Sequence, residues 1–186
     1  MLVLLPGSRQ QEVDRHWPIF LKTVERLKQD NPNLQVMVGK AANVSFTPIP
    51  NTFKIEDNAR KAMVAGTAAL VSSGTATLEC AVEDTPMVVC YKLSGVSWWM
   101  ANTMASVKYA SMVNLIADEI IVPEFLQQDM TASNLVAAVL PLLDHKNNLR
   151  KKMLTGFEKV RRTLGMPGVY DRAAESILSK TKVEHD

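Results

Sequence analysis

The sequence predicts an α/β fold, in which helices cover both faces of a parallel sheet. In the first half of the chain, short apolar runs alternate with segments whose bulky apolar residues recur at helical spacing. Turn-forming Pro, Gly, Asn and Ser residues separate most of these segments. Strands that alternate with helices pair in parallel, because each helix returns the chain to the same end of the sheet.

The first two elements are a strand and a long helix. Residues 2–5 form a continuous apolar run, which predicts a buried strand, and the Pro-Gly-Ser-Arg turn of residues 6–9 leaves its carboxyl end. Apolar residues recur at helical spacing over residues 17–27, so we expect a helix that begins near residue 12 or 15 and ends near residue 29. Pro18 is compatible with such a helix in its first turn.

The same alternation continues to residue 91. We expect strands at residues 34–38, 52–55, 68–71 and 87–91, a helix at residues 58–65, and a helix that ends near residue 83. Five strands joined by helices indicate a doubly wound, Rossmann-like domain, which we assign to residues 1–145. A chain of 186 residues is long enough for one such domain with a substantial core.

The second half of the chain is mostly helical. Pro123 begins a short turn or helix that reaches Gln127, and Thr131 caps a helix that ends at Leu143. Two helices over residues 147–164 and 169–182 form a helical tail, broken by the Gly-Met-Pro-Gly sequence between them. We expect residues 146–186 to pack on the domain or to cross from it to another domain.

Residues 94–113 are rich in bulky apolar side chains and poor in charges. The simpler interpretation is that most of these side chains pack against the sheet. The alternative is an exposed patch, with Trp98 and Trp99 as members, that touches a partner domain, a lipid or a membrane surface.

Composition places the chain among soluble globular proteins. Hydrophobic residues make up 47% and charged residues 22%, and the net charge of +2 argues against a nucleic-acid partner. Cys80 and Cys90 lie in apolar segments without a partner motif, which is typical of reduced core thiols in a cytosolic protein. No apolar run is long enough to predict a membrane span. Because the first residues already form a core strand, we expect that a longer parent chain preceded them.

The turn after the 68–71 strand is the first candidate site. Residues 73–77 are small and mostly hydroxyl-bearing, and they begin a helix at the sheet edge where parallel α/β folds bind ligands. Free backbone N–H groups and the helix dipole attract phosphate there. Glu79 lies one turn further on, where a carboxylate can accept hydrogen bonds from ribose hydroxyls. This pattern indicates a nucleoside diphosphate; an ordinary N-cap, with Glu79 complementing the dipole, is the alternative.

Arg9 is the second candidate, because it leaves the first strand at the same edge of the sheet. A guanidinium can donate paired hydrogen bonds to phosphate and stays charged at any working pH. Ser8 and the backbone of Gly7 can join it. The alternative is a surface ion pair with Glu12 or Asp14.

Several other chemistries are not indicated. The sequence contains no P-loop, no Gly-rich dinucleotide-binding turn and no nucleophile-elbow motif. No group of residues has metal-ligand spacing, and we expect neither a metal nor a cofactor. His16, His145 and His185 form no cluster, and we expect each to be solvated or to lie at a helix end. The chain therefore lacks an obvious base or nucleophile, and we interpret it as a binder of a charged nucleotide.

Several motifs follow one another along nearly the whole chain up to the tail helices. They are Leu4-Leu5-Pro6-Gly7-Ser8-Arg9 with Glu12, Ser73-Gly74-Thr75-Ala76-Thr77-Leu78-Glu79, Pro86-Met87-Val88-Val89, Tyr91-Lys92, Lys108-Tyr109, Asn114-Leu115-Ile116 and Val122-Pro123-Glu124-Phe125-Leu126-Gln127. In this order they resemble the carboxyl-terminal half of lipid-A-disaccharide synthase. Thr67, where the family usually has an acid, and Met112-Val113, where Leu-Pro is common, depart from the pattern.

The resemblance implies the carboxyl-terminal half of a two-domain, inverting GT-B glycosyltransferase without a metal. Such an enzyme transfers 2,3-diacylglucosamine from its UDP carrier to 2,3-diacylglucosamine 1-phosphate and releases UDP. The resemblance implies donor-binding roles for Ser8, Arg9, Ile55, Ser73, Gly74, Thr75, Ala76, Thr77, Glu79, Asn114, Glu124 and Gln127. It places the diphosphate at Arg9 and the turn, the ribose at Glu79, and the uracil at the backbone near residues 53–56, which include Ile55.

The resemblance also implies partners and a location. An amino-terminal half supplies most of the acceptor site and the general base, and the acceptor is an acylated glucosamine 1-phosphate. The enzyme is expected in the cytoplasm, peripheral on the inner membrane of a Gram-negative bacterium. Whether it forms a homodimer is left open. Two rival interpretations also stay open: a fragment of a two-domain UDP-sugar epimerase, and a non-catalytic nucleotide-binding or assembly module.

Overall fold

A single parallel sheet organises the fold in the computed structural model, which describes residues 1–93, 108–165 and 168–183. The strands are β1 (Leu2–Leu5), β2 (Val36–Gly39), β3 (Phe53–Glu56), β4 (Ala68–Ser72), β5 (Met87–Tyr91) and β6 (Glu124–Leu126), in the order β3-β2-β1-β4-β5-β6. All neighbouring pairs are parallel. The chain moves outward from β1 to β3 and then crosses to β4, so the carboxyl ends of β1 and β4 flank the point where such sheets bind ligands.

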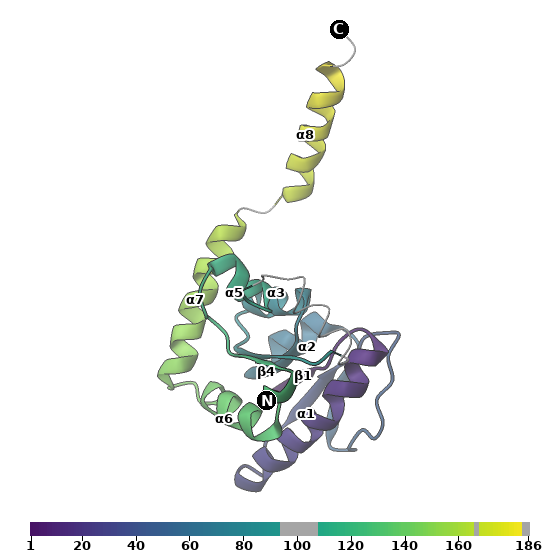
Figure 1. The fold of residues 1–186 in the computed structure, drawn as a ribbon, viewed down its shortest axis with the longest axis vertical. Coiled ribbons are helices and arrows are strands. Elements are labelled where there is room, and N and C mark those ends of the chain that lie inside the picture. Colours follow the sequence, from purple (N-terminus) through teal and green to yellow (C-terminus); the bar gives the residue numbers. More distant parts are fainter. Residues whose placement is uncertain (94–107, 166–167, 184–186) are drawn as a thin grey trace.

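Helices cover both faces of this sheet, which confirms the doubly wound α/β prediction (Figure 1). They are α1 (Gln10–Asp30), α2 (Ala59–Ala65), α3 (Thr75–Val82), α5 (Met112–Ala117), α6 (Ala132–Leu143), α7 (Asn148–Leu164) and α8 (Val169–Val183), with a short 3-10 helix, η1 (Gln127–Asp129). Helices α1 and α6 pack side by side on one face, and α2 and α3 pack together on the other. Helix α7 packs against α3, α5 and α6.

The core lies on both sides of the central strands. Every residue of β1 and β4 is buried, as expected for continuous apolar runs in strands covered on both faces. Helix α1 contributes Trp17, Phe20 and Val24, which recur at helical spacing and are buried against the sheet. This packing fixes the carboxyl ends of β1 and β4 and hence the turns that follow them.

Helix α1 begins earlier than the sequence predicts, so Pro18 lies in its third turn and not in its first. A proline inside a helix leaves the carbonyl four residues earlier, here that of Asp14, without its usual partner. Both Pro18 and Asp14 are exposed, so water can hydrate the freed carbonyl. The buried face of α1 supplies the stabilisation that outweighs the lost hydrogen bond.

The prediction of a turn or short helix at residues 123–127 is wrong for its first part. Glu124–Leu126 forms the edge strand β6, paired with β5, and the Val89 N–H donates to the Pro123 carbonyl oxygen over 2.9 Å. Proline is tolerated at the start of an edge strand, where its missing donor is not needed. The short helix α5 was not predicted, and the Ser111 hydroxyl caps it by accepting from the Asn114 N–H.

The two tail helices differ from each other. Helix α7 buries Met153, Phe157 and Val160 against the domain, whereas α8 projects away from it (Figure 1). Most of the apolar 94–113 stretch, including Trp98 and Trp99, lies outside the described residues. None of the helices in the described parts of the chain is long and apolar enough to cross a bilayer.

Candidate functional site

A cavity of about 430 Å³ lies at the carboxyl ends of β1 and β4. Its polar lining comes from the Gly7–Arg9 loop after β1, from the Ser72–Ala76 turn after β4, and from the carboxylates of Glu12 and Glu79. The sequence predicts this convergence, because parallel strands bring their following turns to one edge of the sheet. Arg9 and the Ser73 turn, more than 60 residues apart in sequence, thus share one cavity.

The amino terminus of α3 opens into this cavity, and its N-cap residue is a glycine. Gly74 has no side chain with which to cap the helix start. Its φ of +154° belongs to a region that residues with a Cβ rarely adopt. The first N–H groups of a helix have no partner within the helix, and the helix dipole adds partial positive charge. The backbone of Gly74, Thr75 and Ala76 therefore suits an anion.

The hydroxyl groups of the turn have different surroundings. The Ser73 hydroxyl lines the cavity and donates to the Ala110 carbonyl oxygen over 2.6 Å. Thr75 is exposed on the cavity wall. Thr77, by contrast, is fully buried outside the lining, and its hydroxyl donates to the Gly74 carbonyl oxygen over 2.7 Å. Thr77 thus shapes the turn from within.

Arg9 and Glu12 form an ion pair at the mouth of the cavity, with Arg9 Nη1 and Glu12 Oε1 3.2 Å apart. The Arg9 side chain is 79% exposed. Exposed ion pairs contribute little, so an incoming phosphate can compete for the guanidinium. Glu12 packs directly beside Gly7, where an added Cβ would lie 2.6 Å from a carboxylate oxygen. Gly7 therefore keeps the loop close enough to Glu12 for this pair to form.

Glu79 and Ile55 occupy different places relative to the cavity. Glu79 is exposed on α3, one turn after the helix start, and lines the cavity. Ile55 is half exposed on the edge strand β3 and lies outside the lining. It pairs with Val38 on β2, next to Gly39, which does line the cavity. Ile55, which marks the expected uracil position, therefore pairs with the residue directly before Gly39 of the cavity wall.

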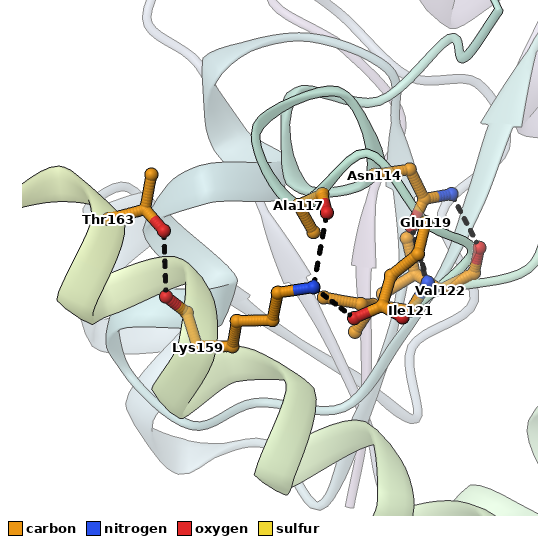
Figure 2. A network of polar contacts seen from close by, with 7 residues as sticks. All are labelled: Asn114, Ala117, Glu119, Ile121, Val122, Lys159 and Thr163. Atoms are coloured by element: carbon orange, nitrogen blue, oxygen red, sulfur yellow. Dashed lines mark hydrogen bonds and ion pairs between the residues drawn. The ribbon is translucent and has the colours of Figure 1, made fainter.

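Asn114 and Glu124 lie in a hydrogen-bond network beside the cavity. The Asn114 amide donates to the Val122 carbonyl oxygen, and its oxygen accepts from the N–H groups of Ile121 and Val122, over 2.8–3.0 Å (Figure 2). The amide also donates to the Glu124 carboxylate over 2.8 Å. Asn114 is fully buried and uses all four of its hydrogen-bonding positions. Its side chain thus holds the 121–122 backbone in place.

The Glu124 carboxylate extends this network toward the turn. It accepts from the N–H groups of Ala110 and Ser111, each over 2.8 Å. The carbonyl oxygen of Ala110 is the acceptor of the Ser73 hydroxyl. Glu124 thus positions the segment against which the Ser73 turn rests. On the other side of the network, Lys159 of α7 donates to the Ala117 carbonyl oxygen and pairs with Glu119 (Figure 2).

Gln127 follows β6 with a φ of +49°, which is uncommon for a residue with a Cβ. Its side-chain nitrogen is buried and has no hydrogen-bond partner within the described residues. Gln127 does not line the described cavity. A strained backbone and an unsatisfied amide in one residue are features that cluster at functional sites.

Two further residues at this edge were missed by sequence analysis. Ser72 lines the cavity, and its buried hydroxyl has no partner among the described residues. Its position directly before the Ser73 turn was the available signal. The expectation that His16 is solvated or at a helix end is wrong, because His16 is completely buried within α1. His145 is exposed, as expected, and His185 lies outside the described residues.

The comparisons with known proteins agree with this architecture. Residues 1–176 match the family model described as lipid-A-disaccharide synthetase. The chain is 36% identical over 185 residues to the lipid-A-disaccharide synthase of Myxococcus xanthus, covering 95% of this chain and 48% of that protein. It is 39% identical over 174 residues to that of Pseudoalteromonas translucida, covering 87% and 45%. The chain spans about half the length of the curated relatives it matches.

Two solved structures share the fold. They are the spinosyn forosaminyltransferase SpnP, with a TM-score of 0.55, and the glycosyltransferase SnogD from Streptomyces nogalater, with a TM-score of 0.54. Each is 13% identical in sequence; they cover 96% and 95% of this chain and 43% of their own chains. These likenesses support the GT-B-type fold, and the match to the family model decides the family. The chain belongs to the lipid-A-disaccharide synthetase family.

Proposed function

We propose that this chain is the donor-binding half of a lipid-A-disaccharide synthase, and that its cavity holds the UDP part of the sugar donor. The observation that carries this proposal is the convergence of the uncapped start of α3 and the Arg9 guanidinium on one cavity. Both groups favour a phosphate, and they come from separate strands of the sheet. The family of the chain supports the choice of a sugar nucleotide.

The proposed contacts follow the donor from its diphosphate outward. Ser8, Arg9, and the turn of Ser73, Gly74, Thr75 and Ala76 bind the diphosphate, with Thr77 fixing the turn from below. Glu79 accepts hydrogen bonds from the ribose hydroxyls, and the backbone near Ile55 meets the uracil. Asn114 and Glu124 position the segment against which the turn rests. We assign Gln127, whose side-chain nitrogen has no partner among the described residues, to the sugar part of the donor.

In the proposed reaction, a hydroxyl of 2,3-diacylglucosamine 1-phosphate attacks the anomeric carbon of UDP-2,3-diacylglucosamine. A new C–O bond forms with inversion, the bond from that carbon to the diphosphate breaks, and UDP leaves with the electron pair. The hydroxyl proton passes to a base, which we assign with the acceptor site to an amino-terminal half outside this chain. The contribution of Arg9 and α3 is to stabilise the negative charge that builds up on the leaving diphosphate.

A location follows from the same proposal. Substrates with two acyl chains reside in a membrane, so the enzyme has to meet them at its surface, and we place it in the cytoplasm on the inner membrane of a Gram-negative bacterium. Trp98 and Trp99, outside the described residues, are the proposed membrane contacts, because tryptophan is favoured at bilayer interfaces. Lys92 and Lys108 flank them and suit anionic head groups. A homodimer is compatible with this arrangement.

Calorimetric titration with UDP and with uridine tests the nucleotide site. Charge-assisted hydrogen bonds contribute about 1.5–3 kcal/mol, so Arg9→Ala is expected to weaken UDP binding by roughly tenfold to a hundredfold. Uridine lacks phosphates, so its weaker binding is expected to stay nearly unchanged. Arg26→Ala removes an exposed arginine from the far end of α1 and serves as the matched control.

The contrary outcomes separate the rival functions. Equal losses of UDP and uridine affinity in Arg9→Ala would show that Arg9 does not bind the phosphates. Absence of UDP binding by the native chain would favour a non-catalytic assembly module. If UDP binds, product analysis with a chain that also contains the acceptor half distinguishes transfer of the acylated sugar from epimerisation.

A further inference from the structure

His16 joins two loops at the carboxyl edge of the sheet. Its ring is completely buried, with Nδ1 2.8 Å from the Pro6 carbonyl oxygen and Nε2 3.0 Å from the Lys92 backbone nitrogen. Pro6 begins the loop after β1, and Lys92 directly follows β5. One side chain of α1 therefore fixes the spacing between these two loops.

These two contacts require one protonation state. A carbonyl oxygen can only accept, so Nδ1 carries the hydrogen, and a backbone N–H can only donate, so Nε2 offers its lone pair. The neutral Nδ1–H tautomer meets both conditions. The imidazolium form carries a hydrogen on both nitrogens, so it cannot accept the hydrogen bond from Lys92.

The surroundings of the ring favour the neutral form. Burial is the largest influence and lowers the pKa of His16 below its usual value, and the charges of Arg15 and Lys92 lower it further. The hydrogen bond to Pro6 and the charge of Glu12 act in the opposite direction. The rings of Phe20 and Tyr91 lie 6.3 Å and 6.1 Å away and complete its surroundings.

Both loops lead to the cavity. Pro6 directly precedes Gly7, Ser8 and Arg9, which line it. Lys92 lies two residues after Cys90, whose carbonyl oxygen accepts from the Ser73 N–H over 3.0 Å. His16 thus connects, through short stretches of backbone, to both segments that supply the polar lining.

We propose that His16 is a positioning residue of the nucleotide site, which holds the Ser8–Arg9 loop in register with β5 and the Ser73 turn, and that its protonation releases the Lys92 backbone and loosens the site. This inference rests on the proposed function of the cavity. Acidification is therefore expected to weaken nucleotide binding through His16 and Lys92, although neither residue is proposed to touch the nucleotide.

Titration of the full chain with UDP, from pH 8 down to the pH at which the ¹⁵N shifts of the ring show that His16 has taken up a proton, tests the inference. His16→Gln places an amide that can accept from the Lys92 N–H and does not titrate, whereas His16→Leu can make neither hydrogen bond. Net hydrogen-bond contributions predict that His16→Leu binds UDP about threefold to tenfold more weakly at pH 8. The native chain is expected to lose about threefold to tenfold more affinity on acidification than His16→Gln does. Because the UDP phosphate titrates in the same range, this difference between the two proteins is the measured quantity.

His145→Gln is the matched control, because His145 is exposed after α6. The UDP affinity of this variant is expected to change with pH as that of the native chain does. Identical pH profiles for native and His16→Gln proteins would overturn the inference. A gain in native affinity relative to His16→Gln on acidification would also overturn it, because the added positive charge would then outweigh the loss of position.

A second measurement does not depend on UDP. The ¹⁵N chemical shifts of the His16 ring are expected to show the proton on Nδ1 at pH 8, and the protection factor of the Lys92 amide, its exchange rate relative to an unprotected amide at the same pH, is expected to fall once His16 is protonated. A proton on Nε2 would overturn the inference directly. If the native chain does not bind UDP at pH 8, the proposed function fails together with the nucleotide role of His16; if it binds UDP and the variants behave like native, only the present inference fails.

Discussion

Two glycines determine the backbone beside the cavity, each for a different reason. Gly7 has a φ of +128°, and an added Cβ would also lie 2.6 Å from the Glu12 carboxylate. Gly74 has a φ of +154°, but an added Cβ would meet no atom of the described residues within 4 Å. Backbone conformation and crowding both exclude a side chain at Gly7, whereas backbone conformation alone excludes one at Gly74.

Gly74→Ala is therefore expected to lower the free energy of unfolding by about 1–3 kcal/mol, through backbone strain without a clash. The turn is also expected to shift, which weakens UDP binding. Gly165→Ala is the matched control, because Gly165 at the end of α7 has a φ of +81° and equally open surroundings. Urea unfolding should report a clear loss for Gly74→Ala and a smaller one for Gly165→Ala, because the chain can relax at the end of the folded domain, and UDP titration should report a loss for Gly74→Ala only. Equal UDP affinities would place the anion elsewhere.

The burial of a side chain was predictable from the sequence only where its apolar neighbours along the chain indicate it. Cys80 and Cys90 are buried free thiols, as their apolar neighbours indicate. Burial, with smaller contributions from Glu79 and Glu83, raises the pKa of Cys80 to about 12, and burial raises that of Cys90 as well. His16 could not be placed, because its partners are backbone groups of distant loops and have no sequence signature.

At the scale of elements, the central strands and the helices after residue 131 were predictable, whereas strand β6 and helix α5 were not. Residues 2–5 and 87–91 form strands with the expected ends, because buried parallel strands are continuous apolar runs. The Arg9 loop and the Ser73 turn converge because strand order alone brings them together. Strand β6 and helix α5 depend instead on hydrogen bonds to β5 and Asn114, which sequence periodicity does not record.

The Asn114 network gives a test at this scale. Asn114→Asp replaces an amide donor, 2.8 Å from the Glu124 carboxylate, by a second carboxylate. Lost donors and buried like charges are expected to lower the free energy of unfolding at pH 8 by about 2–5 kcal/mol. The loss is expected to shrink near pH 5, as one carboxyl group takes up a proton. Chemical denaturation at both pH values measures it.

Asn134→Asp is the control for this substitution. Asn134 is partly exposed in the first turn of α6. The change removes the hydrogen bond that its amide donates to the Asp129 carbonyl oxygen but adds a negative charge that complements the helix dipole, so only a small net change in stability is expected. Native-like stability of Asn114→Asp at pH 8 would show that the network does not hold the 108–124 region together.

At the scale of the molecule, the helical tail expected at residues 146–186 contains two unlike helices. Helix α7 belongs to the domain: Met153, Phe157 and Val160 are buried, and Arg150 donates to the Leu142 carbonyl oxygen over 2.8 Å. In α8, by contrast, the side chains of residues 170–179 are exposed. The end of the folded domain therefore lies near Gly165.

Two truncations locate this boundary. A chain that ends at Gly165 is expected to unfold within about 0.5 kcal/mol of the full chain, because it loses only exposed side chains. Its UDP affinity is expected to be unchanged, because α8 contributes nothing to the cavity lining. A chain that ends at Lys146 loses Phe157 and Val160 from the core, and truncating one buried phenylalanine costs about 3–5 kcal/mol. Since a whole domain is stable by only about 5–15 kcal/mol, the shorter chain is expected not to fold.

Thermal unfolding measures the stability of both truncated chains, and UDP titration measures their nucleotide affinity. If the chain that ends at Gly165 is markedly less stable than the full chain, α8 is part of the folded domain.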